Sequence, residues 1–132
     1  MSNNINSASG GNNILVIDDN VDAAFTLQML LKLKGYQVEI RHDGHEAIAA
    51  AESLRPEVIL LDISMPGMSG YEVCKQIREQ EWGKTIVIVA LTGFGKEEDK
   101  KRTQEAGFDA HLVKPVDLQT LMDVLNQLLK KP

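Results

Sequence analysis

The sequence has little of what several large protein classes require. It contains one cysteine, Cys74, so no disulfide can form within the chain, and a reducing compartment is expected. No apolar run approaches the length of a membrane-spanning helix, and the N-terminus has no basic stretch followed by an apolar one. The formal net charge is -5, with acidic residues scattered along the chain, which argues against a nucleic-acid-binding protein. We therefore expect a cytoplasmic protein without membrane insertion or direct nucleic-acid binding.

The length and the apolar pattern predict a single domain. A chain of 132 residues with 43% hydrophobic residues is long enough to bury one core. Residues 1–12, MSNNINSASGGN, offer almost nothing to bury, so we expect a disordered tail or linker there and the domain at 13–130. Within that domain we expect strands at 14–17, 38–40, 58–61, 86–91 and 110–113, alternating with helices at 21–34, 44–53, 70–80, 96–105 and 117–130.

The strand sequences indicate a parallel sheet that is covered on both faces. VILLD at 58–62 and IVIVAL at 86–91 are apolar at consecutive positions, as in strands with helices on either side. Gly35 and Gly107 follow helical patterns, where a left-handed helix end favours glycine. Right-handed crossovers then predict a doubly wound, flavodoxin-like α/β fold with five parallel strands in the order 2-1-3-4-5.

Polar side chains stand at the carboxyl ends of four expected strands. Asp18 and Asp19 follow the first, Asp62 the third, Thr92 the fourth and Lys114 the fifth. In a doubly wound sheet these ends meet at one rim, where ligands bind. Carboxylates in close contact repel by roughly 4 kcal/mol per pair at an effective dielectric near 20, so a divalent cation is expected among them. Mg²⁺ fits best, because it takes oxygen ligands from carboxylates and phosphates.

Each of these residues also has an ordinary structural explanation. The aspartate pair could belong to a helix N-cap, and Asp62 could open a turn. Thr92 could be a simple strand exit, and Lys114 could be a solvated lysine before a proline that starts a helix. None of these explanations accounts for the joint occurrence of such residues at consecutive strand ends.

Four motifs carry a family resemblance. IDDN at 17–20, LLDISMPGMSGYE at 60–72, ALTG at 90–93 and LVKP at 112–115 resemble, in this order and spacing, the receiver domain of two-component response regulators. The resemblance covers about residues 13–129. It implies a phosphorylation-dependent signalling switch that accepts a phosphoryl group from a phosphohistidine on a histidine kinase or a phosphotransfer domain, and it implies no separate substrate.

The resemblance also implies a role for each residue at the rim. They share one site, in which Mg²⁺ and the phosphoryl group are held by the phosphoacceptor Asp62, the metal ligands Asp18 and Asp19 with the Ser64 backbone carbonyl, the switch hydroxyl Thr92 and the phosphate-binding Lys114. The peptide bond before Pro115 is expected to be cis. A downstream protein would bind the face made by the fourth helix, the fifth strand and the fifth helix.

The sequence departs from the family pattern at His111, and two further positions leave the phosphoryl lifetime open. His111 stands where relatives have a tyrosine or phenylalanine that moves with the switch hydroxyl, so the role of this ring is open. Ser64 and Phe94 occupy positions that tune hydrolysis, and a small and a bulky residue there have opposing effects. The helix at 96–105 has almost no apolar stripe, which predicts a weakly anchored and easily moved element.

Other functions remain open on the sequence alone. A flavodoxin-like FMN carrier shares the topology, but the two aspartates that follow the first strand of this chain would repel the flavin phosphate. A haloacid-dehalogenase-like phosphohydrolase needs a second acid where Ser64 stands. A receiver fold that acts as a phosphorylation-independent interaction module would lack a site residue. The chain is expected to be either a single-domain response regulator or the receiver module of a hybrid histidine kinase.

Overall fold

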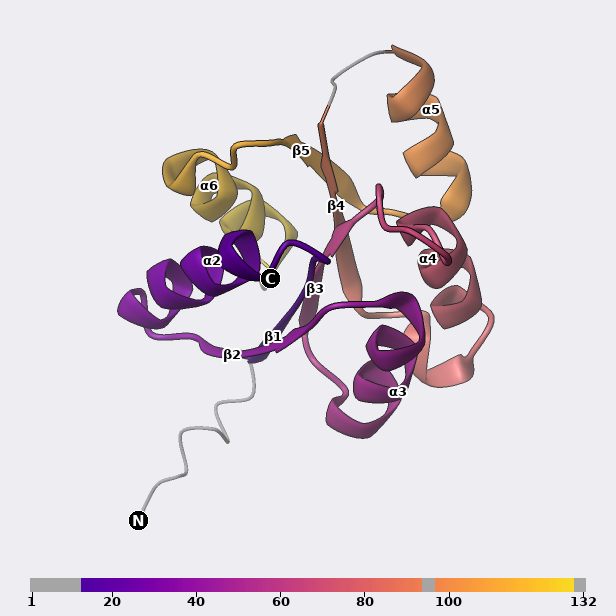
Figure 1. Cartoon of the computed structure of the whole chain (residues 1–132), viewed down its shortest axis with the longest axis horizontal. Helices are drawn as coiled ribbons and strands as arrows, with labels where there is room; N and C mark the ends of the chain where they lie inside the picture. The colour runs from indigo at the N-terminus through magenta and orange to yellow at the C-terminus, as the bar shows by residue number, and fades with distance from the viewer. Residues whose placement is uncertain (1–12, 94–96, 130–132) are drawn as a thin grey trace.

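The computed structural model of the chain describes residues 13–93 and 97–129 and shows one parallel five-stranded sheet (Figure 1). The strands lie in the order β2-β1-β3-β4-β5, which confirms the doubly wound α/β fold. Their bounds are β1 (Asn13–Ile17), β2 (Gln37–Arg41), β3 (Val58–Asp62), β4 (Val87–Thr92) and β5 (Ala110–Val113). Non-consecutive strands β1 and β3 are neighbours, so the switch point lies between them.

Helices cover both faces of this sheet. In Figure 1 one group of helices lies on one side of the strands and a second group lies on the other side. The first group is α2 (Val21–Leu33) and α6 (Leu118–Leu128), and the second is α3 (Gly44–Leu54), α4 (Gly70–Arg78) and α5 (Glu97–Ala106). A short 3₁₀ helix, η1 (Glu81–Gly83), follows α4. Among the described residues, no helix combines the length and the apolar character that crossing a bilayer requires.

The consecutive apolar residues of the strands feed two separate cores. Val16 and Leu60 pack under α2 and α6, whereas their neighbours Ile17 and Leu61 pack under α3 and α4. Successive strand residues point to opposite faces, so a strand that is covered on both sides must be apolar throughout. All five residues of β3 are buried.

Several expected element boundaries are corrected by one or a few residues. The helix expected at 70–80 ends at Arg78, because the chain turns there into η1. The last helix begins at Leu118, because Asp117 is its N-cap and accepts a hydrogen bond from the Thr120 backbone. The fourth strand runs from Val87 to Thr92. The expected tail at 1–12 and the helix ends expected at 96 and 130 lie outside the described residues.

Two glycines adopt the backbone conformation that the sequence predicts for them. Gly35 has a φ of 97° and Gly107 a φ of 105°, both in the left-handed region; Gly35 lies two residues after the end of α2, and Gly107 directly follows α5. A side chain at either position would strain the backbone. These turns send the chain back into β2 and β5.

Candidate functional site

The carboxyl ends of the strands bring the five predicted residues to one rim. Asp18, Asp62 and Thr92 are buried, with 1%, 3% and 1% of their surface exposed, whereas Asp19 is exposed. Lys114 directly follows β5, and its backbone N–H donates to the Thr92 carbonyl over 2.7 Å. Charged groups this deeply buried need partners, so their mutual contacts decide what the site can bind.

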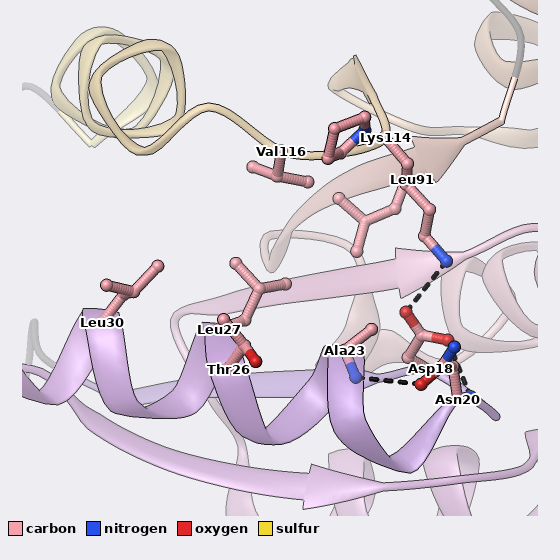
Figure 2. Close-up of a pocket in the computed structure, with 10 residues that line it drawn as sticks. Asp18, Asn20, Ala23, Thr26, Leu27, Leu30, Leu91, Lys114 and Val116 are labelled. Carbon is pink, nitrogen blue, oxygen red and sulfur yellow. Dashed lines mark hydrogen bonds and ion pairs between the residues drawn. The ribbon is translucent and has the colours of Figure 1, made fainter.

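The aspartate pair does not cap the following helix. Asn20 is the N-cap of α2, and its side-chain oxygen accepts a hydrogen bond from the Ala23 backbone over 3.0 Å. The Asn20 backbone N–H in turn donates to Asp18 Oδ1 over 2.9 Å (Figure 2). Because Asn20 is the N-cap, the helix end does not require the carboxylate of Asp18 or Asp19 as its cap.

Among the described residues, Lys114 places a positive charge beside the carboxylates of Asp18 and Asp62. Its Nζ lies 2.9 Å from Asp18 Oδ2 and 3.4 Å from Asp62 Oδ2, and Figure 2 shows the side chain directed at Asp18. Burial lowers the pKa of Lys114, but the hydrogen bonds and charges of the two carboxylates outweigh burial, so the net pKa is raised. The ammonium group is therefore charged at neutral pH. The Lys114–Pro115 peptide bond is cis, as predicted.

Asp62 is held in an environment that disfavours its ionised form. Burial, the largest cause, and the nearby Asp18 carboxylate raise the pKa of Asp62 to about 6, while the Ser64 backbone hydrogen bond and Lys114 act in the opposite direction. The Ser64 N–H donates to Asp62 Oδ1 over 2.9 Å. The positive charge of Lys114 therefore does not fully offset burial and the negative charge of Asp18.

The acidic cluster fits a divalent cation. One carboxylate oxygen from each of Asp18, Asp19 and Asp62 lies within 4.8 Å of the others. Three carboxylates and one ammonium leave an excess of negative charge in a largely buried site, and all the donor atoms are the oxygens that hard cations take. These residues could hold a metal ion.

His42 also contacts the site, which the sequence pattern does not indicate. Its Nδ1 lies 3.0 Å from the Asp18 backbone carbonyl, and the Asp18 N–H donates to the Arg41 carbonyl over 3.1 Å. His42 directly follows β2, so its place at the carboxyl end of a strand next to β1 is the signal that could have identified it. The contact steadies the backbone that carries the aspartate pair.

His111 lies on the face of the sheet that α5 covers. Its strand neighbours Ala110 and Leu112 pack in the core under α2 and α6, so His111 points to the opposite face. His111 pairs in register with Ala90, which lies two residues before Thr92 in β4. His111 and Thr92 are therefore on the same face of the sheet. Its role as the switch ring stays a prediction, and Phe94 lies outside the described residues.

Comparisons with known proteins agree with this geometry. The family model of the response regulator receiver domain matches residues 14–126. The response regulator MprA of Mycobacterium avium is 36% identical over 118 residues, which are 89% of this chain and 51% of that protein. The chain thus spans about half the length of this relative.

Solved receiver structures are also similar. Chemotaxis protein CheY4 of Vibrio cholerae has a TM-score of 0.85 at 34% identity, covering 89% of this chain and 98% of CheY4. The receiver domain of sensor histidine kinase PA1611 from Pseudomonas aeruginosa, with magnesium in its active-site cleft, has a TM-score of 0.84 at 31% identity, covering 92% and 99%.

A third similar structure contains a signalling partner. The receiver domain of Ssk1 from Saccharomyces cerevisiae, solved in complex with the histidine phosphotransfer protein Ypd1, has a TM-score of 0.84 at 27% identity, covering 90% of this chain and 89% of Ssk1's. The motifs, the strand order, the family match and the structural likeness all agree. The chain therefore belongs to the receiver domain family of two-component response regulators.

Proposed function

We propose that the chain is a phosphorylation-dependent switch in which Asp62 accepts a phosphoryl group from a phosphohistidine. The observation that carries this proposal is a set of ion pairs at the carboxyl ends of β1, β3 and β5. In it, Lys114 contacts the buried carboxylates of Asp18 and Asp62. The donor is a histidine kinase or a histidine phosphotransfer protein, the class of protein bound to the Ssk1 receiver domain. The test is a gain of one phosphoryl group in the intact mass after incubation with acetyl phosphate and Mg²⁺.

We assign different tasks to the two oxygens of Asp62. A carboxylate is a weak nucleophile, so catalysis depends on positioning and on neutralising charge. Asp62 Oδ1 accepts the Ser64 N–H, which leaves Oδ2, 3.4 Å from Lys114 Nζ, to form the new bond to phosphorus. That bond forms as the phosphorus–nitrogen bond to the donor imidazole breaks. The charged Lys114 and the Thr92 hydroxyl then bind the transferring oxygens.

Mg²⁺ is the cation that we propose for the acidic cluster. Asp18, Asp19 and Asp62 would hold it, together with the Ser64 backbone carbonyl. When bound, the ion supplies positive charge for the acceptor carboxylate and the phosphoryl oxygens. The magnesium in the cleft of the PA1611 receiver domain supports this choice.

Asp62→Asn is expected to stabilise the protein when no metal is present. The pKa of Asp62 is raised from 3.8 to about 6, so the folded state binds the proton more tightly than the unfolded state does. Stability is therefore lost as the pH rises from about 4 to about 6, and above that ionised Asp62 costs about 1–3 kcal/mol. Urea unfolding with a chelator at pH 7.5 should show the variant more stable, with little difference near pH 4.

Asp19→Asn is the control for this stability experiment. Asp19 belongs to the same cluster but is exposed, so its neutralisation should change the free energy of unfolding much less. Saturating Mg²⁺ should narrow the gap between wild type and Asp62→Asn, because the ion binds the folded wild type more tightly. A less stable Asp62→Asn at pH 7.5 would contradict the electrostatic account.

An exposed apolar stripe on α2 adjoins the site. Its members are four residues apart and lie on one side of the helix: Val21, Phe25, Met29 and Leu33, each more than half exposed. Beside α2, a cavity of about 450 Å³ is lined by Leu27, Leu30, Val116 and the site residues Asp18 and Lys114 (Figure 2). No member of the stripe lines this cavity, so the stripe meets the site only at the start of α2.

We propose that the phosphohistidine protein docks on this stripe. The donor must bring its imidazole to Asp62, so its contact surface has to adjoin the rim. The stripe does so, because α2 begins three residues after Asp18. A downstream protein would use the other edge of the sheet, where β5 lies between α5 and α6 and Val113 is 45% exposed (Figure 1). The two partners would then bind different surfaces.

Phe25→Glu is expected to slow phosphotransfer from the protein donor by about 10-fold or more, because a charge replaces a central apolar contact. Labelling by acetyl phosphate should be unchanged, because this small donor needs no docking surface. The measurement is the initial rate with each donor. Leu54→Glu is a matched control, since Leu54 is a 40% exposed apolar residue at the end of α3, outside the stripe. Equal slowing by both variants would place docking elsewhere.

A further inference from the structure

A cation–aromatic contact joins α5 to α4 near the rim. The guanidinium carbon of Arg102, on α5, lies 4.1 Å from the centroid of the Tyr71 ring, on α4. That ring packs edge-on against Phe108, with centroids 6.4 Å apart and an interplanar angle of 84°. Phe108 is buried, so its contact restricts the orientation of the Tyr71 ring on which the Arg102 guanidinium lies.

The same arginine lines a cavity beside the proposed phosphoacceptor. This cavity has a volume of about 300 Å³, and its other lining residues include Ser64, Ser69, Thr92 and Gly93. Ser64 donates its backbone N–H to Asp62, and Thr92 ends the neighbouring strand β4. The cavity therefore opens at the rim on the α5 side, whereas Lys114 lines the cavity on the α2 side.

Phosphorylation changes the charge next to this cavity. A carboxylate with one negative charge becomes an acyl phosphate with up to two, and it gains three acceptor oxygens. Lys114 already pairs with Asp18 and Asp62, so the added charge attracts a further cation. Arg102 is exposed, and the planar fork of donors on its guanidinium matches phosphoryl oxygens. Its contact with the Tyr71 ring is weaker than a charge-assisted hydrogen bond to a phosphoryl group would be.

We propose that Arg102 senses phosphorylation of Asp62: its guanidinium leaves the Tyr71 ring and pairs through the cavity with the phosphoryl oxygens. The inference rests on the proposed function of Asp62. Among the described side chains of α5, Thr103 and Ala106 are the buried ones, so the helix is anchored over a short stretch and can follow its arginine. This route moves α5 without requiring the ring of His111.

Nuclear magnetic resonance of the arginine Nε–H groups tests the proposal. In the free protein the Tyr71 ring should shift the Arg102 signal upfield, and Arg102→Lys assigns that signal by its loss. After labelling with acetyl phosphate and Mg²⁺, the signal should move downfield, and it should stay in place in Asp62→Asn. An intact mass is recorded on each sample. A phosphoryl gain with an unmoved signal overturns the role of Arg102 alone, whereas the absence of a gain overturns the proposed function as well.

A matched pair of variants gives a second readout. Arg102→Ala and Lys101→Ala each remove one positive charge from α5, but only Arg102 lines the cavity. The affinity for fluoroberyllate, a phosphoryl analogue that binds carboxylates, should fall about 5- to 10-fold in Arg102→Ala and less than about 2-fold in Lys101→Ala. Equal losses would show a general charge effect and overturn the proposal. Circular dichroism verifies that both variants are folded.

Discussion

Asp62→Asn is expected to abolish phosphorylation, with labelling by acetyl phosphate and Mg²⁺ reduced more than about 100-fold. An amide oxygen is a far poorer nucleophile than a carboxylate oxygen, so the variant cannot form the new bond to phosphorus. The amide has nearly the same size and can still accept the Ser64 N–H that Asp62 Oδ1 accepts over 2.9 Å. The loss should therefore reflect chemistry and not folding, and intact-protein mass over a time course measures it.

Two controls make this result specific. Asp123→Asn neutralises an exposed carboxylate on α6 and should be labelled like the wild type. A chelator should suppress labelling of the wild type, because the carboxylates of Asp18 and Asp19 are expected to act through a cation. Labelling that persists in Asp62→Asn would assign the phosphoryl group to another residue. An unlabelled wild type, beside a receiver domain that is labelled, would favour a phosphorylation-independent interaction module.

Arg78→Ala is expected to lower the free energy of unfolding by about 2–4 kcal/mol, because it leaves several buried acceptors without their donor. Arg78 ends α4, and its guanidinium donates to the carbonyls of Gly107, Gly83 and Ile86 over 2.9, 2.9 and 2.7 Å. It also forms an ion pair with Asp109 at 2.9 Å, with 19% of the arginine side chain exposed. Urea unfolding at pH 7 measures the loss.

The Arg78 network lies at the end of the sheet opposite the site. Asp109 also accepts the Ile88 backbone N–H over 2.9 Å, so Arg78 and Asp109 together join the start of β4 to the turn before β5. Those strands carry Thr92 and Lys114 at their far ends. The contact thus ties these two strands together at the end opposite the rim.

Arg41→Ala provides the comparison for Arg78→Ala. Arg41 pairs with Glu39 at 3.5 Å, with 35% and 61% of the two side chains exposed. Such a surface pair contributes at most about 1 kcal/mol. Arg78→Lys should recover only part of the lost stability, since one ammonium group cannot reach all the acceptors of the guanidinium. Equal losses in Arg78→Ala and Arg41→Ala would mean that the buried network adds nothing.

The fold and most of the rim could be predicted from the sequence. Consecutive apolar residues at 58–61 indicated a strand buried on both faces, and β3 is fully buried. The positions of Asp18, Asp62, Thr92 and Lys114 at strand ends were enough to bring them together, because parallel strands end at one edge. These features follow from periodicity and from local order along the chain, which a single sequence displays directly.

The arrangement of the charges at the rim depends on tertiary packing. The raised pKa of Asp62 follows from burial and from Asp18, which lies 44 positions earlier in the chain. Asp18, and not the neighbouring Asp19, is the buried partner of Lys114, a difference that two adjacent aspartates do not show in sequence.

The contacts of the arginines were likewise decided by packing. Arg78 binds carbonyls from three separate segments, and Arg102 lies over a ring on another helix. In the sequence both are charged residues in helical patterns, and nothing local separates them from solvated ones. Their partners are set by how α4 and α5 pack on the sheet, so their roles depend on the fold as a whole and not on spacing along the chain.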